Sequence, residues 1–225
     1  KKATKVFNSV FNKYDIMNDL MSLGIHRLWK KRLIEWMNPK KDDHLIDMAA
    51  GTGDIANAFL SRIKNQGYVS CVDPNKLMIE QGRKKLKYLN NIQWHVSSAE
   101  NLPFEDNIFD IYSVSFGVRN FSDTQKALKE AHRVLKSGGR FICLEFSKVE
   151  NEILNKVYKT YSKTIPFIGK YIVGDSEPYD YLIKTIDEFY DQESFKKIIL
   201  DNGFNNVEYR NLSGGIVAIH SAWKI

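Results

Sequence analysis

The sequence predicts an α/β protein with a seven-stranded, mostly parallel sheet, helices on both faces and an antiparallel hairpin at its C-terminal end. Short apolar runs alternate with helical segments up to Ser147, a pattern typical of parallel sheets. Beyond it, two strand-like runs are joined across Ser213-Gly214-Gly215, a link short enough for an antiparallel hairpin. The strands are expected at residues 44–49, 68–72, 92–96, 109–115, 140–146, 207–212 and 216–223.

The segments between these strands have helical character. Helices are expected at residues 55–64, 75–89, 123–135, 152–164 and 193–202. Glycine commonly ends a helix, so Ser137-Gly138-Gly139 is expected to stop the third of them. No repeat, low-complexity tract or linker divides the 225 residues, which predicts a single domain.

Composition excludes several classes of protein. The chain is 43% hydrophobic and 27% charged, and no run of eighteen apolar residues predicts a membrane span. Cys71 and Cys143 lie in predicted buried strands and are expected to be reduced core thiols. No Cys/His cluster has metal-ligand spacing, so no metal is expected. The net charge of +6 includes basic clusters at residues 27–32 and 83–87, which indicate solvated helix faces or attraction to anionic lipid. Nothing resembles a nucleic-acid module.

A glycine loop after the first strand indicates a nucleoside site. Gly51 and Gly53 allow a backbone to approach a ligand closely, and the second strand ends at Asp73, about twenty residues beyond the first glycine. Such an acid can bind ribose hydroxyls. The spacing fits a dinucleotide because Ala56 is a permitted third position. However, Asp54 at the helix start is expected to repel a pyrophosphate and to suit a sulfonium or ammonium group, which favours S-adenosylmethionine over NAD.

Four further segments resemble signatures of the UbiE/MenG quinone C-methyltransferases. They are residues 14–30, 116–120, 144–148 and 214–220. The resemblance covers nearly the whole chain and implies the Rossmann-like class I methyltransferase fold. One departure is Ala50, where many members carry glycine; alanine fits if its φ stays negative. The implied reaction passes a methyl group from S-adenosylmethionine to a ring carbon of a polyprenylated benzoquinol or naphthoquinol, with ubiquinone biosynthesis favoured.

The cofactor site implied by the loop and the resemblance lies at the carboxyl ends of the first four strands. Asp47 is expected to engage the methionine amino end, or else to cap the loop. Ser98 and Ala99 are expected near the adenine, and Ser115 beside the cofactor unless its hydroxyl only bonds backbone. The full set is Asp47, Gly51, Thr52, Gly53, Asp73, Ser98, Ala99 and Ser115.

The expected catalytic residues are Arg119, Tyr14 and Asn18. An arginine stays protonated, so Arg119 is expected to stabilise a phenolate or orient a water. The alternative is a structural ion pair with Asp110 or Asp123. The Tyr14 hydroxyl is expected to contact the ring oxygen, or else the side chain packs in the core. Asn18 and His26 lie in the same segment, and His26 is expected to be structural rather than a proton carrier.

The resemblance also implies that four segments of the single domain have different roles. Residues 1–40 are expected to form a helical lid, 41–147 the cofactor-binding core, 148–190 a helical substrate cap, and 191–225 the final helix and hairpin. Aromatic residues of the cap, among them Tyr161 and Tyr181, are expected to line a tunnel for the polyprenyl tail. The chain is expected to be cytoplasmic and to contact the inner membrane surface. Its other expected partners are the quinol, quinone-biosynthesis enzymes and a second copy of itself. A methyltransferase of another acceptor and a catalytically silent subunit are the alternatives.

Overall fold

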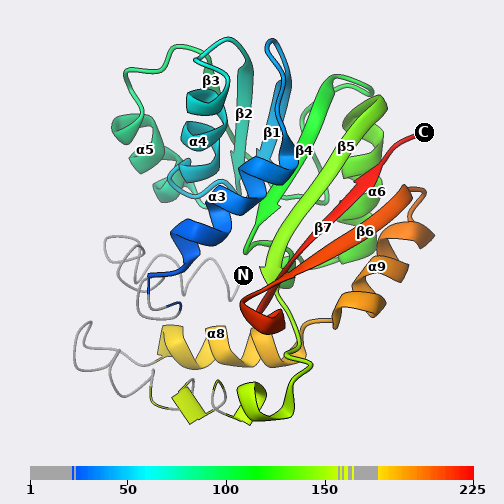
Figure 1. The fold of residues 1–225 in the computed structure, drawn as a ribbon. Coiled ribbons are helices and arrows are strands. Elements are labelled where there is room, and N and C mark those ends of the chain that lie inside the picture. Colours follow the sequence, from blue (N-terminus) through cyan, green and yellow to red (C-terminus); the bar gives the residue numbers. More distant parts are fainter. Residues whose placement is uncertain (1–21, 23, 157, 159, 162–163, 165–176) are drawn as a thin grey trace.

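The computed structural model describes residues 22, 24–156, 158, 160–161, 164 and 177–225. They form a seven-stranded sheet in the order β3-β2-β1-β4-β5-β7-β6 (Figure 1). The strands are β1 His44–Met48, β2 Tyr68–Asp73, β3 Ile92–Val96, β4 Phe109–Ser115, β5 Leu135–Phe146, β6 Asn205–Leu212 and β7 Val217–Trp223.

The first five strands are parallel, and β7 runs antiparallel between β5 and β6. The chain builds outward from β1 to β3 and then restarts at β4 on the other side of β1. Ligands of open α/β sheets bind at such a switch point, outside the carboxyl ends of the strands. The predicted fold class is confirmed, and the switch point where such folds bind ligands lies between β1 and β4.

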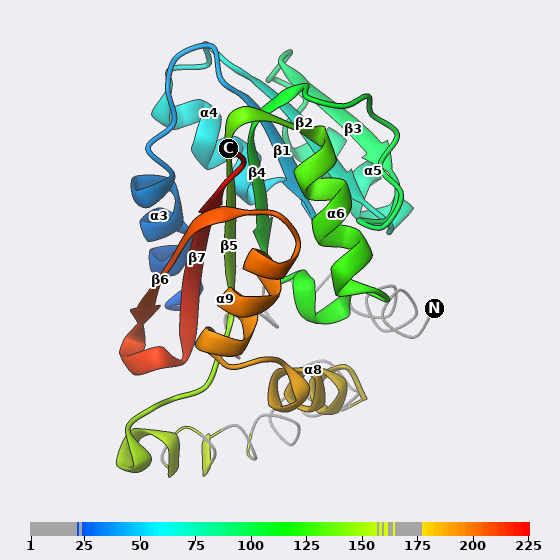
Figure 2. The same cartoon turned by 90° about the vertical axis from the view of Figure 1, so that its right-hand side faces the viewer.

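Helices cover both faces of this sheet. The helices are α3 His26–Met37, α4 Asp54–Arg62, α5 Lys76–Lys85, α6 Thr124–Val134, α8 Glu177–Glu188 and α9 Gln192–Asp201, with short 3-10 turns at η2 Val118–Asn120 and η3 Ser213–Gly215. Figures 1 and 2 place α3 and α4 on one face and α6 and α9 on the other. α8 lies apart from both layers, beyond the carboxyl ends of the parallel strands.

Alternate residues of the strands supply two separate cores. Leu45 of β1 packs in the core beneath α3 and α4, whereas its neighbour Ile46 packs in the core beneath α6 and α9. Cys71 and Cys143 are divided between these cores in the same way, and both are buried free thiols. Both faces of the parallel sheet are thus covered, as its near-continuous apolar strands require.

α3 is an integral part of the first core. Its buried side chains Trp29, Leu33 and Met37 are at most 3% exposed and pack with residues of α4 and the sheet. Residues 26–37 of the segment predicted as a lid therefore form part of the packed body. Residues 1–21 of that segment lie outside the described residues.

The predicted glycine stop after α6 is wrong. α6 ends at Val134, and Leu135 already has extended backbone angles and begins β5. Phe109 pairs with Leu135 but Ile111 pairs with Arg140, so the intervening residues of β5 form a bulge. Gly138 has a φ of 78° within this bulge. Gly138 and Gly139 therefore belong to a bulge in β5 and do not end a helix.

The ends of the other elements differ only modestly from prediction. Strands other than β5 begin and end within two residues of the predicted limits. The helix predicted to reach residue 89 ends at Lys85, because Leu86 leaves the helical backbone conformation. All described residues of the helix predicted at 152–164 are helical, namely residues 152–156, 158, 160, 161 and 164.

Candidate functional site

The loop between β1 and α4 contains three residues in the left-handed backbone region. They are Ala49, Gly51 and Gly53, with φ values of 56°, 55° and 85°. Ala50 does not have a positive φ, so the condition for alanine at that position is met. Ala49 instead has the left-handed backbone conformation, which costs a residue with a Cβ atom about 1–2 kcal/mol relative to the right-handed one. Such strain recurs at ligand sites.

The two glycines of the loop have different surroundings. A Cβ at Gly53 would lie 2.8 Å from atoms of Leu86 and Trp94, so the loop packs closely against the end of α5 and β3. A Cβ at Gly51 would meet no atom within 4 Å, and its backbone borders open space. The backbone can therefore be approached by a ligand at Gly51.

Asp73, the last residue of β2, is anchored beside this open position. Its carboxylate accepts hydrogen bonds from the backbone N–H of Gly51 at 3.0 Å and of Asn75 at 2.8 Å. The residue is 8% exposed, and burial raises its pKa to about 6. The amide bonds fix the carboxylate in orientation, as recognition of a sugar hydroxyl requires.

Asp47 and Ser115 present buried oxygen atoms without a partner. Asp47 is 1% exposed, and its Oδ2 accepts no hydrogen bond in the described part of the chain. Burial raises its pKa to about 8. Ser115 Oγ at the end of β4 also lacks a partner there, so the alternative of a backbone-bonded hydroxyl is not observed. Buried unsatisfied groups are costly, so these two oxygens are available to a water or a ligand at the end of the sheet.

The remaining predicted donor-site residues lie at the same edge. The N–H of Ser97 bonds to the carbonyl of Asp73 at 3.3 Å, which brings the half-buried Ser98 and the buried Ala99 past the end of β2. Thr52 is 7% exposed, and its hydroxyl accepts a bond from Lys85 at 3.3 Å.

Asp54 has partners within the protein that the sequence did not predict. Its carboxylate forms ion pairs of 2.7 Å with Lys30 from α3 and with Lys85 from α5. These two cations hold the pKa of Asp54 well below its usual range. The two ion pairs compensate its charge, and the preference of this position for a sulfonium over a pyrophosphate stays a prediction.

Arg119 lies in η2, directly beyond the end of β4. Its guanidinium pairs with Glu145 of β5 at 2.5 Å, and the two side chains are 5% and 2% exposed. Nη1 also donates to the carbonyl of Phe116 at 2.8 Å, and the group lies 5.4 Å from the centre of the Phe146 ring. The Nε atom is buried and has no hydrogen-bond partner in the described part of the chain.

The predicted alternative partners of Arg119 are wrong. Asp110 pairs with Lys136, and Asp123 caps α6 by accepting from the N–H of Lys126. Sequence reasoning missed Glu145 as a site residue, although it lies within the segment 144–148 that carries the family resemblance. The available signal was an acid inside an otherwise apolar strand, which must have a partner when buried.

Two helices outside the sheet reach this region. Tyr181 of α8 donates its hydroxyl to Asn120 Oδ1 at 3.0 Å, next to Arg119. Trp29 of α3 lies 6.2 Å from the rings of both Phe116 and Phe146, and its Nε1 donates to Ser213 Oγ at 2.9 Å. The aromatic cluster and the ion pair therefore adjoin each other at the ends of β4 and β5.

Tyr14 and Asn18 lie outside the described residues. His26 is described, and it is 5% exposed at the start of α3, where its backbone N–H bonds to Ser22 Oγ at 3.2 Å. Among the described residues, no group of three His, Cys, Asp or Glu side chains could hold a metal ion.

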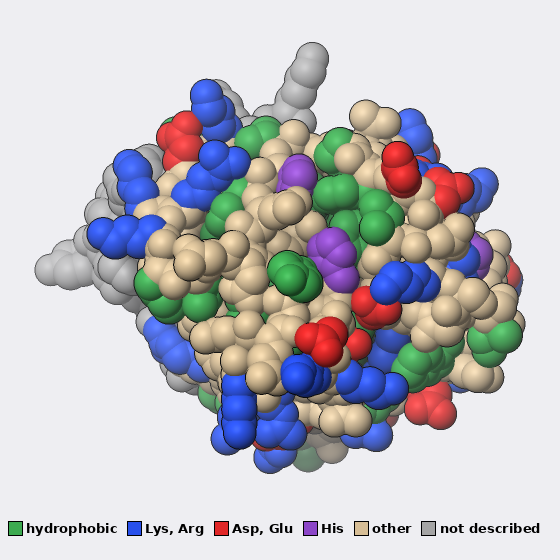
Figure 3. All heavy atoms as spheres, turned by 90° about the horizontal axis from the view of Figure 1, so that it is seen from above, with side chains coloured by type: hydrophobic (Ala, Val, Ile, Leu, Met, Phe, Trp, Pro, Cys, Tyr) green, Lys and Arg blue, Asp and Glu red, His purple; other side chains and the backbone are tan. Residues whose placement is uncertain are grey.

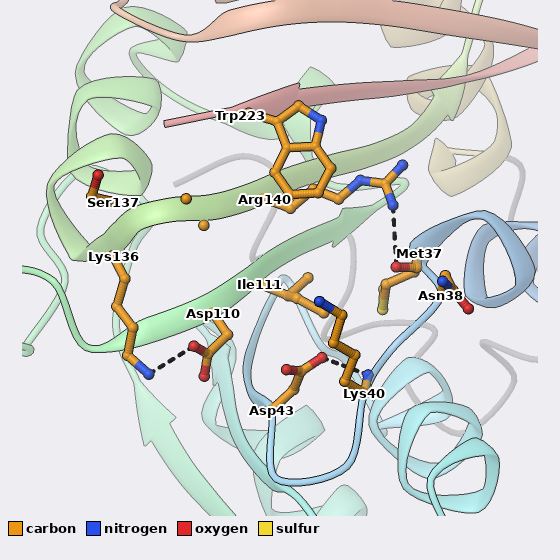
Figure 4. Close-up of a pocket in the computed structure, with 12 residues that line it drawn as sticks. Met37, Asn38, Lys40, Asp43, Asp110, Ile111, Lys136, Ser137, Arg140 and Trp223 are labelled. Carbon is orange, nitrogen blue, oxygen red and sulfur yellow. Dashed lines mark hydrogen bonds and ion pairs between the residues drawn. The ribbon is translucent and has the colours of Figure 1, made fainter. Parts of the chain in front are cut away.

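The opposite edge of the sheet has a different character. Figure 3 looks onto it, and acidic and basic side chains are intermixed there. A cavity of about 170 Å³ lies at this edge, and Figure 4 shows its lining residues. Lys136 pairs with Asp110, and Arg140 donates to the carbonyl of Met37. These charged groups already have partners, and none belongs to the predicted site.

The fold and its switch-point loop define a Rossmann-like class I methyltransferase. A SAM-dependent methyltransferase of Thermotoga maritima has this fold, with a TM-score of 0.68 and 19% identity over 98% of this chain and 99% of that one.

The sequence comparisons identify the family. The model of the ubiE/COQ5 methyltransferase family matches residues 1–224. The chain is 50% identical to the ubiquinone/menaquinone biosynthesis C-methyltransferase UbiE of Rickettsia bellii (strain OSU 85-389) over 99% of this chain and 92% of that protein. It is 49% identical to the UbiE of Francisella tularensis subsp. novicida over 100% of this chain and 91% of that protein. The chain therefore belongs to the ubiE/COQ5 methyltransferase family, which confirms the resemblance.

Proposed function

We propose that this chain methylates a ring carbon of a polyprenylated benzoquinol or naphthoquinol. Its relatives are named ubiquinone/menaquinone biosynthesis C-methyltransferases, which supports the proposal. The observation that carries the proposal is the buried cation of Arg119 beside the donor loop. We infer that a ring oxygen beside the reacting carbon binds to this cation. The proposal thus pairs a methyl donor at the loop with a phenolic acceptor at Arg119.

We infer that the donor is S-adenosylmethionine, which supplies an electrophilic methyl group on a sulfonium when bound. The residues present fit this group. Asp47 offers an unpartnered buried carboxylate oxygen to the methionine ammonium, and Asp73 offers a fixed carboxylate to the ribose. The open space at Gly51 leaves room for the ligand beside the backbone.

The chain's own groups also address the central chemical problem, which is to make carbon nucleophilic. Loss of a ring hydroxyl proton to a base or a bridging water places charge on oxygen and on the ortho carbon. That carbon then bonds to the methyl group as the bond from the methyl group to sulfur breaks, S-adenosylhomocysteine leaves, and the carbon loses its own proton to solvent, which restores the aromatic ring. Arg119 stays protonated, and its unpartnered Nε–H can donate to that oxygen. Glu145 keeps the guanidinium in place, so little reorganisation is needed as charge develops. Tyr14 and Asn18 are proposed to complete the acceptor side.

The test is a methyl-transfer assay with labelled S-adenosylmethionine and both demethylated quinols. Transfer to either quinol supports the proposal, and the faster one identifies the ring. A parallel screen with a small amine, a sterol and an RNA tests the rival acceptors. Calorimetry tests the silent-subunit alternative, because such a subunit would fail to bind the donor.

We propose in addition that the chain visits an anionic membrane surface to reach its lipid-soluble acceptor. Among the described residues, no helix is long and apolar enough to cross a bilayer. The outer side of α3 carries Lys31 and Arg32 next to Leu28, which is 51% exposed, and Ile25 at the start of the helix is 39% exposed. Basic residues flanking exposed apolar ones suit an anionic interface.

A liposome pelleting assay tests this contact. Binding to anionic vesicles should fall with salt and should weaken in the double variant Lys31→Glu/Arg32→Glu. The matched control, Lys126→Glu/Lys129→Glu, makes the same charge change on exposed residues of α6, which covers the opposite face of the sheet. Equal loss in both variants would count against a specific role of α3.

A further inference from the structure

A groove lies between α3 and α4, which cover the same face of the sheet (Figure 1). Its volume of about 560 Å³ falls within the range of small-molecule sites, roughly 300–1,000 Å³. Ile34 and Ala58 give it apolar surface, and Asn57 and Ser61 add uncharged polar groups. The charged side chains that line it are Arg27, Lys30, Lys31, Glu35, Asp54 and Arg62.

The two acids of the groove are both compensated, and each has a partner that does not line it. Glu35 accepts from Arg32 at 2.7 Å, and Asp54 binds Lys85 of α5 at 2.7 Å. Asp54 also binds Lys30, at 2.7 Å. The remaining basic residues of the lining therefore give the groove an excess of positive charge, which attracts anions.

Lys31 of α3 and Arg62 of α4 line the groove from different helices, and both are exposed. Neither forms an ion pair or a side-chain hydrogen bond in the described part of the chain. Asn57 Oδ1 accepts from the hydroxyl of Tyr88 at 3.2 Å, which leaves the amide nitrogen of Asn57 to donate. A guanidinium, an ammonium and uncharged donors at Asn57 and Ser61 are the groups that bind a phosphate.

Exposed side chains beside the groove favour a lipid as the source of that phosphate. Leu28 precedes Lys31 by three residues and therefore lies next to it on α3, and Ile25 is exposed at the start of the same helix. Tyr88 contacts the lining from the segment after α5 and is also exposed. Apolar and tyrosine side chains suit the boundary between headgroups and acyl chains, whereas a free phosphate ester gains nothing from them.

We propose that this groove binds the phosphate group of an anionic glycerophospholipid. The proposal deepens the membrane contact proposed for α3 and rests on it for the source of the ligand, but it does not depend on methyl transfer. Diffuse attraction to a membrane depends on the basic charge near the surface. A groove instead requires particular residues, and it binds a single lipid molecule.

The experiment titrates the protein with dihexanoyl phosphatidylglycerol below its micelle concentration and follows backbone amide NMR signals of α3 and α4. Monomeric lipid has no charged surface, so diffuse attraction to a bilayer does not contribute. Lys31→Gln/Arg62→Gln should weaken binding by roughly tenfold or more, because charge-assisted hydrogen bonds to the phosphate are lost. The matched control Lys84→Gln/Lys87→Gln removes the same charge from exposed residues that do not line the groove, and it should keep the wild-type affinity.

A neutral variant separates hydrogen bonding from net charge. Ser61→Ala leaves the charge unchanged and should weaken binding by roughly threefold. An affinity equal to that of the wild type would count against a direct contact of Ser61 with the phosphate. All of the substituted side chains are exposed, so thermal melting should show each variant folded like the wild type.

The remaining outcomes are also decisive. No binding by the wild type, or equal weakening in the two double variants, would overturn the groove as a site. Equal affinity for dihexanoyl phosphatidylcholine would overturn the requirement for an anionic headgroup. Glycerol 3-phosphate bound as tightly as the lipid would overturn the lipid as occupant in favour of a free phosphate ester. Pelleting with vesicles but no binding of monomers would overturn the groove alone, whereas the reverse would support it and overturn the membrane contact.

Discussion

The guanidinium of Arg119 and the carboxylate of Glu145 form a buried ion pair that joins the segment after β4 to the end of β5. Glu145 also accepts from the backbone N–H of Phe146 and of Arg119 itself. Such pairs contribute little net stability, because desolvation offsets the attraction, but breaking one leaves a costly unpaired charge. We therefore interpret the pair as a contact that orients Arg119 rather than one that stabilises the fold.

The stability and the function of this pair can be separated. Glu145→Ala should lower the free energy of unfolding by about 3–5 kcal/mol, because Arg119 would remain buried without its partner. The double variant Arg119→Met/Glu145→Leu should recover much of that loss in urea denaturation, since no charge remains buried. It should nevertheless lose methyl transfer. Retained turnover in the double variant would show that Arg119 does not act on the acceptor.

Gly53 and Gly138 offer a matched pair of glycine substitutions. Both have positive φ, at 85° and 78°, so alanine should cost about 1–2 kcal/mol at either. Only at Gly53 would the new Cβ also clash, with Leu86 and Trp94, whereas nothing lies near Gly138. Gly53→Ala should therefore lose donor affinity in calorimetry while Gly138→Ala keeps it. Similar donor affinity in both variants would refute the packing argument for the loop.

His220 should make the protein less stable in acid. It is 2% exposed in β7, one ring nitrogen contacts the carbonyl of Gln192 at 3.0 Å, and burial lowers its pKa from 6.5 to about 4. The unfolded chain therefore binds more protons than the native one between these values. Stability from this group is full above pH 6.5 and is lost as pH falls toward 4, by roughly 3 kcal/mol.

The comparison with His220→Gln isolates this contribution from that of the carboxylates. Urea denaturation at pH 7, 5.5 and 4.5 should show a steeper loss in the wild type than in the variant. Parallel pH dependences would mean that the imidazole titrates normally.

Tyr161 and Tyr181 test the proposed path of the polyprenyl tail. Alanine at either position should weaken turnover of long-tail quinols more than of short analogues, because apolar contact along the tail is lost. Tyr181→Phe keeps the ring but removes the hydrogen bond to Asn120. It should slow both substrates while preserving the preference for the longer one. Equal losses for long and short substrates in the alanine variants would exclude the tunnel.

Much of the fold was predictable because it is encoded locally. Periods of apolar residues marked the strands, and the link at Ser213-Gly214-Gly215 correctly indicated a hairpin. Gly138 and Gly139 led to the wrong prediction of a helix end, because glycine with a positive φ occurs both at helix ends and in strand bulges. Only the pairing of Phe109 with Leu135 and of Ile111 with Arg140 distinguishes the two.

The sequence by itself determined the family, the glycine loop after β1 and the acids near the ends of β1 and β2, because these depend on short motifs and on spacing along the chain. The tertiary structure alone decided which charges meet. Asp54 binds Lys30 and Lys85, and Arg119 binds Glu145, over separations of more than twenty residues. Such contacts depend on how the helices and strands pack against one another. The sequence offers several acids as a partner for each cation. Packing around the sheet selects among them.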